Sequence, residues 1–216
     1  MSSAGNAPRA SASPATVASG IRVIAGLGNP GARYQDTRHN AGFWFVERVA
    51  AAHGAEFRGA PRVFGEVAEL RLGSALVRLL KPSTFMNESG RSVAALARYY
   101  SVPADAVLVA HDEIDLPPGT VRLKRGGGHG GHNGLRDVVA QLGGPQFARL
   151  RIGVGHPGHR EQVIGYVLTR PGAQERSLID DAVARAAGRF DDMIVNGLEQ
   201  VMNDLHRQPD GGAASA

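Results

Sequence analysis

The sequence predicts an α/β fold, a single domain with a mixed, mostly parallel twisted sheet and helices on both faces. Three observations support this prediction. Short apolar runs typical of buried strands alternate with segments of helical periodicity. Two of the strands are joined by a tight turn, which places an antiparallel hairpin within the sheet. The chain of 216 residues is long enough for one well-packed core and short for two.

The strands are expected where short apolar runs are bounded by turn residues. The first is "RVIAGLG" (22–28), and the hairpin occupies residues 63–82 with its turn at Leu72-Gly73. The others are "AVLVAHDEID" (106–115), "GTVRLKRG" (119–126) and "ARLRIGVG" (148–155). The glycines of "RGGGHGGHNG" (125–134) favour a loop, because fixing so many glycines in a helix or strand costs much conformational entropy.

The helices are expected where apolar residues recur every three to four positions. Residues 40–54 have this pattern, with Asn40 as N-cap and Gly54 as the stop. Residues 87–100 form a second helix, and Asn133 caps a third over 134–143. One last long helix carries an apolar stripe from Leu178 to Leu205, which is typical of core packing.

Composition bounds the class of protein. Hydrophobic residues make up 43% of the chain and charged residues 20%, and no apolar run is long enough to cross a bilayer. The absence of cysteine excludes disulfides, thiolate metal sites and a cysteine nucleophile, and it fits a cytoplasmic protein. The Ser- and Ala-rich residues 1–20 are expected to be a flexible extension, 21–207 the folded domain and 208–216 a flexible tail.

Positive charge is concentrated in one part of the chain. The net charge is +4, and between residues 119 and 160 there is one acid, Asp137. The basic residues there are Arg122, Lys124, Arg125, Arg136, Arg149, Arg151 and Arg160. Such a stretch favours a positive face that attracts nucleic acid phosphates. A solvated surface that only aids solubility is the alternative.

A glycine motif follows the first strand, where Gly26, Gly28 and Gly31 spell G-x-G-x-x-G. In a dinucleotide-binding fold this motif opens a helix directly, and an acid about twenty residues later binds the ribose. Here Pro30 lies inside the motif, and the position about twenty residues beyond it falls in "VAAAHG" (49–54), a helical stretch without an acid. We therefore expect the glycines to turn the backbone sharply and leave the Asn29 amide exposed at the carboxyl edge of the sheet.

Four longer motifs carry a resemblance to a known family. They are "GLGNPGARYQDTRHNAG", "LLKPSTFMNESG", "VAHDEIDLPPGTVRLKRGGGHGGHNGL" and "RLRIGVGHPG". In order and spacing they resemble the bacterial peptidyl-tRNA hydrolase family, from about Ile21 to Arg207. The resemblance implies a monomeric α/β enzyme that hydrolyses the ester between a peptide and the 3′ end of tRNA. Such an enzyme releases tRNA for reuse in translation and needs no metal or cofactor.

Ester hydrolysis by water needs a base, and a neutral imidazole suits this near neutral pH. The resemblance places His39 on the family's catalytic histidine and Asp112 on the aspartate that orients it. A carboxylate in that position fixes the histidine tautomer and stabilises the imidazolium that forms. Residue types alone do not choose between Asp112 and its neighbours Glu113 and Asp115.

Three asparagines lie where strands or loops meet helices, namely Asn29, Asn87 and Asn133. A neutral amide both donates and accepts, so these side chains can bind a peptide, a water or an ester oxygen. The resemblance implies that Asn29 helps to distinguish peptides from free aminoacyl groups and that the other two bind substrate near the ester. We hypothesise that Asn87 stabilises the oxyanion, and capping is the alternative role for each asparagine.

The resemblance also implies contacts to the 3′ end and to the 5′ phosphate of the tRNA. Tyr34 and Phe85 match aromatic substrate contacts that can stack on the 3′ adenine, and Met86, also assigned to substrate binding, stands beside Asn87. Core packing is the alternative, above all for Phe85. Lys124 and Arg151 match residues that bind the 5′ phosphate, and the glycine loop 126–131 is expected to form a mobile wall.

Two other functions stay open at this stage. A metal-dependent hydrolase would use the ligand types His129, His132, His156 and Asp112, although H-x-x-H in a glycine loop is not preorganised for metal. An RNA-binding relative without catalysis is the second. The preferred interpretation names peptidyl-tRNA, through its acceptor stem and 3′ CCA end, as partner. It expects neither a membrane nor an obligate protein partner.

Overall fold

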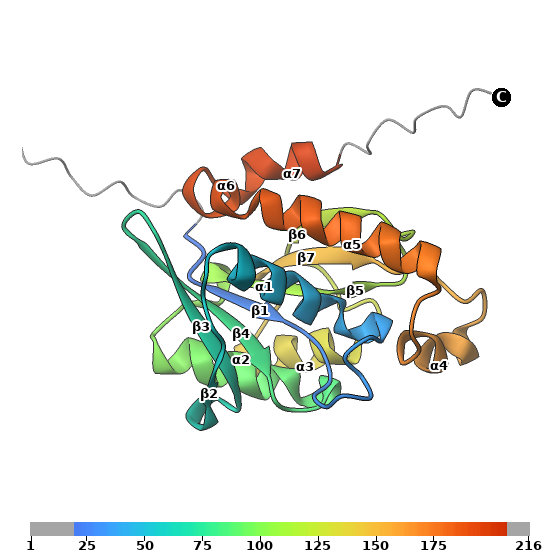
Figure 1. Cartoon of the computed structure of the whole chain (residues 1–216). Coiled ribbons are helices and arrows are strands. Elements are labelled where there is room, and N and C mark those ends of the chain that lie inside the picture. Colours follow the sequence, from blue (N-terminus) through green and yellow to red (C-terminus); the bar gives the residue numbers. More distant parts are fainter. Residues whose placement is uncertain (1–19, 207–216) are drawn as a thin grey trace, which may run out of the picture.

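A seven-stranded sheet forms the centre of the molecule in the computed structural model, which describes residues 20–206 (Figure 1). The strand order is β2-β3-β4-β1-β5-β7-β6. The strands are β1 (Val23–Gly26), β2 (Arg58–Ala60), β3 (Gly65–Leu72), β4 (Ala75–Pro82), β5 (Val107–Glu113), β6 (Val121–Arg125) and β7 (Ala148–Gly153). The expected mixed sheet is confirmed.

Parallel pairing occupies the middle of this sheet and antiparallel pairing its flanks. Strand β1 pairs in parallel with β4 and β5, and β5 with β7. The predicted hairpin is confirmed, because β3 and β4 pair antiparallel up to Leu72 and Ala75. Strand β6 runs antiparallel to β7 at the other edge. The carboxyl ends of β4, β1 and β5 therefore lie side by side, where ligands of such sheets bind.

Helices cover both faces of the sheet (Figure 1). Helices α1, α5, α6 and α7 pack on one face around Phe45, Phe190 and Ile194, and α2 and α3 pack on the other around Leu96 and Leu135. The bounds are α1 Ala41–Ala52, α2 Ser89–Tyr99, α3 Asn133–Leu142, α4 Val163–Val167, α5 Ala173–Gly188, α6 Phe190–Val195 and α7 Leu198–His206. Among residues 20–206, no helix is long and apolar enough to cross a membrane.

The expected single C-terminal helix is wrong, because the structure has three helices there. The chain leaves helical geometry at Arg189, and Gly197 has a φ of 101°, which is outside the helical region. Most of the apolar stripe packs in the core as predicted, but Leu178 is 43% exposed. Strand β2 and helix α4, of three and five residues, were not predicted.

The glycines after β1 allow close approach between backbones. A Cβ on Gly26 would lie 2.3 Å from the carbonyl oxygen of Gly42 in α1, and one on Gly42 would lie 2.3 Å from that of Ala110 in β5. A Cβ on Gly28 would meet the ring of Phe43. The sharp turn that we expected is at Gly31, with a φ of 98°. Helix α1 therefore begins directly against the end of β1 and the middle of β5.

Candidate active site

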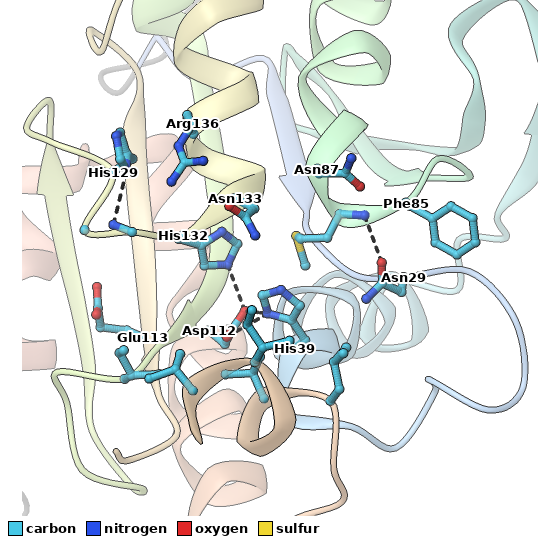
Figure 2. A pocket seen from close by; sticks show the side chains of 18 of the residues that line it. Asn29, His39, Phe85, Asn87, Asp112, Glu113, His129, His132, Asn133 and Arg136 are labelled. Carbon is cyan, nitrogen blue, oxygen red and sulfur yellow. Dashed lines mark hydrogen bonds and ion pairs between the residues drawn. The ribbon is translucent and has the colours of Figure 1, made fainter. Parts of the chain in front are cut away.

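His39 and Asp112 form a close pair at the carboxyl edge of the sheet (Figure 2). His39 lies in a single 3-10 turn, η1 (Arg38–Asn40), immediately before α1, and Asp112 is the penultimate residue of β5. The Nδ1 atom of His39 is 2.9 Å from each carboxylate oxygen. An ionised carboxylate only accepts hydrogen bonds, so Nδ1–H donates and the lone pair of a neutral His39 is on Nε2.

Burial and charge act in opposite directions on this pair. Burial alone would lower the pKa of His39, but the charge of Asp112 and its hydrogen bond outweigh this and raise the pKa above 6.5. Burial would raise the pKa of Asp112, which is 2% exposed, yet the two imidazoles beside it hold that pKa well below its usual range. Asp112 is therefore a permanent carboxylate at neutral pH.

The second imidazole is that of His132, at the first turn of α3. Its Nε2 is 2.9 Å from Oδ1 of Asp112. Its Nδ1 accepts from the backbone N–H groups of Gly134 and Leu135, at 3.1 and 3.3 Å. The prediction that Asn133 caps this helix is wrong, because His132 is the N-cap and Asn133 is the first helical residue.

Asn29 is held in place by its neighbours on two other elements. Its N–H donates to Oδ1 of Asn40 at 2.9 Å, and its carbonyl accepts from Nδ2 of Asn40 at 3.0 Å. Its own Oδ1 accepts from the backbone N–H of Met86 at 2.8 Å. The expected exposure of Asn29 is wrong, since the residue is 6% exposed. Asn40 precedes α1 as predicted, but its side chain makes no capping hydrogen bond.

These side chains line one pocket of about 720 Å³. Asn29, Tyr34 and His39 follow β1, and Phe85, Met86 and Asn87 follow β4. Asp112 and Glu113 end β5. One wall comes from the glycine loop and the start of α3, and the opposite wall is apolar and comes from α4. The lining thus combines the His39–Asp112 pair, three amides and two aromatic rings in one space.

Comparison with known proteins agrees with this geometry. The family model described as peptidyl-tRNA hydrolase matches residues 23–211. A peptidyl-tRNA hydrolase of Halorhodospira halophila is 51% identical over 186 residues, which are 86% of this chain and 96% of that protein. One from Neisseria gonorrhoeae is 50% identical over 186 residues, covering 86% and 97%.

The chain belongs to the peptidyl-tRNA hydrolase family. The crystal structure of a peptidyl-tRNA hydrolase from Acinetobacter baumannii has the same fold, with a TM-score of 0.85 and 47% identity. The match covers 89% of this chain and 98% of that one. The residues that the family model matches, 23–211, include the whole sheet and all four motifs.

In this member of the peptidyl-tRNA hydrolase family the predicted aromatic pair comes together. The rings of Tyr34 and Phe85 are 6.4 Å apart and nearly perpendicular. Core packing is excluded for Phe85, which is 53% exposed at the pocket. Met86 is buried, whereas Asn87 and Asn133 are exposed on the lining.

Lys124 and Arg151 lie on β6 and β7, outside the pocket lining. Lys124 is exposed, but Nε of Arg151 is 2.9 Å from Oε2 of Glu113. Arg149 is 3% exposed and donates to the carbonyl groups of Gly127 and Gly128 in the glycine loop. The positive stretch is therefore not one solvated face, because part of it is buried or paired.

The residues that could bind a metal ion in the structure differ from those considered from the sequence. Among the described residues, the group that could hold a metal ion is His39, Asp112 and His132 rather than the set considered from sequence. Because Nδ1 of His132 accepts two backbone hydrogen bonds, its proton must be on Nε2, which then has no lone pair for a metal. The observed hydrogen bonding does not fit a metal centre.

Sequence reasoning missed three residues that shape the site. His132 was considered only as a metal ligand and Asn40 only as a cap, and Arg38 was not considered. A signal was present in the sequence, because Arg38, Asn40 and His132 stand in "TRHN" and "HNG" at the starts of helices. Polar side chains at such positions often bind nearby backbone groups. Which groups they bind depends on tertiary contacts.

Proposed function

We propose that this chain hydrolyses the ester between a peptide, or an N-blocked aminoacyl group, and the 3′ end of tRNA. The observation that carries the proposal is the His39–Asp112 pair, in a pocket at the carboxyl edge of the sheet, in a chain of the peptidyl-tRNA hydrolase family. A histidine whose tautomer is fixed by a buried carboxylate is a suitable general base.

The chemical steps follow from the tautomer. Nε2 of His39 takes a proton from a water while the water oxygen attacks the ester carbonyl carbon. The imidazolium that forms is stabilised by Asp112 through Nδ1–H. The tetrahedral intermediate collapses, the bond to the ribose oxygen breaks, and that oxygen takes the proton from Nε2. The products are the peptide with a free carboxyl group and tRNA with a free terminal hydroxyl group.

The amides in the pocket supply positioning without adding charge. The Oδ1 atom of Asn29 accepts a hydrogen bond from the backbone N–H of Met86, which fixes the orientation of the amide. Its Nδ2 group then donates to the bound acyl group in the pocket. Asn87, the middle residue of η3 (Met86–Glu88), stabilises the oxyanion of the intermediate, and Asn133 binds substrate beside it. Tyr34 and Phe85 stack on the terminal adenine.

The same proposal covers the rest of the substrate and the chain's organisation. Lys124 and Arg151 contact the 5′ phosphate of the acceptor stem, and the glycine loop 126–131 moves on binding. Residues 21–207 act as a monomeric catalytic domain in the cytoplasm, between the extensions 1–20 and 208–216. The extensions lie outside the described residues, apart from Gly20.

The test is release of the acyl group from an N-blocked aminoacyl-tRNA by the purified full-length chain. His39→Ala is expected to lower kcat by about 10²–10⁴, because it removes the base. The matched control is His53→Ala, since His53 also pairs with a carboxylate, Asp191 at 2.8 Å, but lies outside the pocket lining. Equal activity of the His39 variant and its parent would refute the proposal.

Two further outcomes distinguish the alternatives. Activity that is lost in a chelator and restored by a divalent ion would favour a metal-dependent hydrolase. Binding of tRNA by a parent that releases no acyl group would favour an RNA-binding protein without catalysis. The proposal expects turnover that is insensitive to the chelator.

A further inference from the structure

His132 uses its two ring nitrogens for two different tasks. Nδ1 accepts from the N–H groups of Gly134 and Leu135 at the start of α3, and Nε2 lies 2.9 Å from Oδ1 of Asp112. A neutral imidazole has one proton, and a nitrogen that accepts hydrogen bonds cannot carry it. The proton is therefore on Nε2, and His132 donates to Asp112.

We propose that His132 is a positioning residue which, as a neutral donor fixed on α3, sets how strongly Asp112 holds the Nδ1 proton of His39. This inference rests on the proposed function of His39 as the base. The carboxylate of Asp112 receives one hydrogen bond from each of two elements, η1 and α3. Its negative charge is thereby shared between two donors.

The helix holds His132 in the tautomer with its proton on Nε2. Protonation of Nδ1 would break both hydrogen bonds to the first turn of α3. It would also place a cation at a helix N-terminus, where the backbone N–H groups already make the potential positive. His132 is thus unsuited to act as the base itself, and the transferable proton stays with His39.

The hydrogen bond that His132 donates makes Asp112 less basic, so Asp112 stabilises the protonated form of His39 less strongly. A carboxylate with fewer donors is more basic, and it stabilises the His39 imidazolium more strongly. Loss of the His132 donor is therefore expected to increase the protonated fraction of His39 near neutral pH. Fewer molecules would then have the Nε2 lone pair that the reaction needs.

The other charged groups around the cluster do not replace this bond. His111 of β5 contacts the His132 ring edge to face, and burial lowers the pKa of His111 to about 3, so it stays neutral. Glu113 pairs with Arg151, and Arg38 of η1 pairs with Glu175. The remaining titratable groups that line the pocket, on the loop after β1, the glycine loop, α3 and the segment before α4, are Tyr34, His129, Arg136, His156 and Arg160.

Two substitutions separate the two tasks of His132. In His132→Asn, the amide oxygen replaces the Nδ1 acceptor, but the side chain is too short to donate to Asp112. In His132→Gln, the amide nitrogen reaches the place of Nε2, but the acceptor for the helix is lost. Asn is itself a favourable N-cap residue, whereas Gln is not among those preferred there.

The readouts are the acid limb of kcat/KM against pH, with N-blocked aminoacyl-tRNA, and the Tm. His132→Asn is expected to raise the apparent pKa of the limb by about 0.5–1 unit, a three- to tenfold loss on the acid side. His132→Gln is expected to leave the limb in place and lower the Tm by about 2–4 °C. A limb that neither variant moves, or that both move equally, overturns the proposal.

A measurement on the unmodified protein covers the case in which a variant does not fold. Nitrogen NMR of imidazole-labelled protein reports which ring nitrogen carries the proton. His132 is expected to carry its ring proton on Nε2, as its hydrogen bonds require. A His132 proton found on Nδ1 in the folded protein would overturn the proposal. This result does not depend on ester hydrolysis, so it is separable from a failure of the proposed function.

Discussion

The pairing of His39 with Asp112 makes stability and activity change in opposite directions with pH. The pair stabilises the folded state fully at pH values below 6.5, and this stabilisation is lost as the pH rises through the raised pKa of folded His39. The base needs the deprotonated form, which becomes abundant only over that same rise. The protein is therefore expected to be least active where this pair stabilises it most.

The pH dependence of the parent enzyme follows from this. We expect kcat/KM to rise with pH along an acid limb whose apparent pKa lies above 6.5, because the charge of Asp112 outweighs burial at His39. Asp112→Asn removes that charge, so its residual activity is expected to have a limb at lower pH. Initial rates of acyl release over a pH series provide the measurement. A parent limb below 6.5, unmoved in the Asn variant, would contradict it.

The motifs predicted which residues share a site, whereas the roles of those residues stay predictions. His39, Asp112, Tyr34 and Phe85 were assigned from motifs, and the structure brings their side chains to one pocket. Asn29 was expected to be exposed, yet its carbonyl and N–H are bound by Asn40. Such contacts could not be predicted, because they join the loop after β1 to the start of α1.

At the scale of elements, Arg38 connects the turn that carries His39 to the wall formed by α4. Its Nη1 donates to the carbonyl group of Tyr166 in α4 and to those of Thr169 and Arg170 just after that helix. Its Nη2 lies 2.6 Å from Oε2 of Glu175 in α5, and the guanidinium covers the Tyr166 ring. Only a planar group with several donors can make these contacts together.

Arg38→Lys tests this connection. An ammonium group is expected to keep the pair with Glu175 but lose contacts to the backbone after α4. We expect the Tm to fall by about 2–4 °C. KM is expected to rise several-fold because the apolar wall is less well positioned, while the acid limb stays in place because the His39–Asp112 pair is intact. Thermal unfolding and steady-state kinetics check these outcomes.

Arg78→Lys is the matched control for Arg38→Lys. Arg78 also pairs with a carboxylate, Glu69 at 2.8 Å, and its guanidinium lies 3.5 Å from the Tyr100 ring centroid. It is in β4 and does not line the pocket. A KM that rises equally in both variants would show that the effect of Arg38 is not specific to α4.

The elements themselves were largely predictable from periodicity and turn residues. The buried strands, the hairpin and helices α1 to α3 lie where the patterns indicated. The C-terminal stripe continues through three helices because each of them packs on the same core, so apolar spacing alone did not reveal the breaks at Arg189 and Gly197. Strand β2 is too short for alternation to be read.

At the scale of the whole molecule, the positive charge divides into buried, paired and exposed parts. Arg149 is buried and donates to carbonyl groups of the glycine loop. Arg151 pairs with Glu113, and Arg125 lies 3.1 Å from Glu199. Lys124 is exposed on β6, beside Gly127 of the same loop. The charge pattern of the sequence predicted a positive face, but it did not identify which cations face solvent.

Lys124 is accordingly expected to contribute to the salt dependence of tRNA binding. Each phosphate contact releases condensed counterions, so Lys124→Ala should weaken binding and reduce the slope of log Kd against log salt by about 0.7–0.9. The control is the chain's only other lysine, Lys81, which lies 2.9 and 3.0 Å from Glu47 and Glu66. Because those carboxylates already neutralise it, Lys81→Ala should leave the slope unchanged. Titrations of full-length tRNA at several salt concentrations measure both slopes, and an unaltered slope in Lys124→Ala would argue against a phosphate contact at this position.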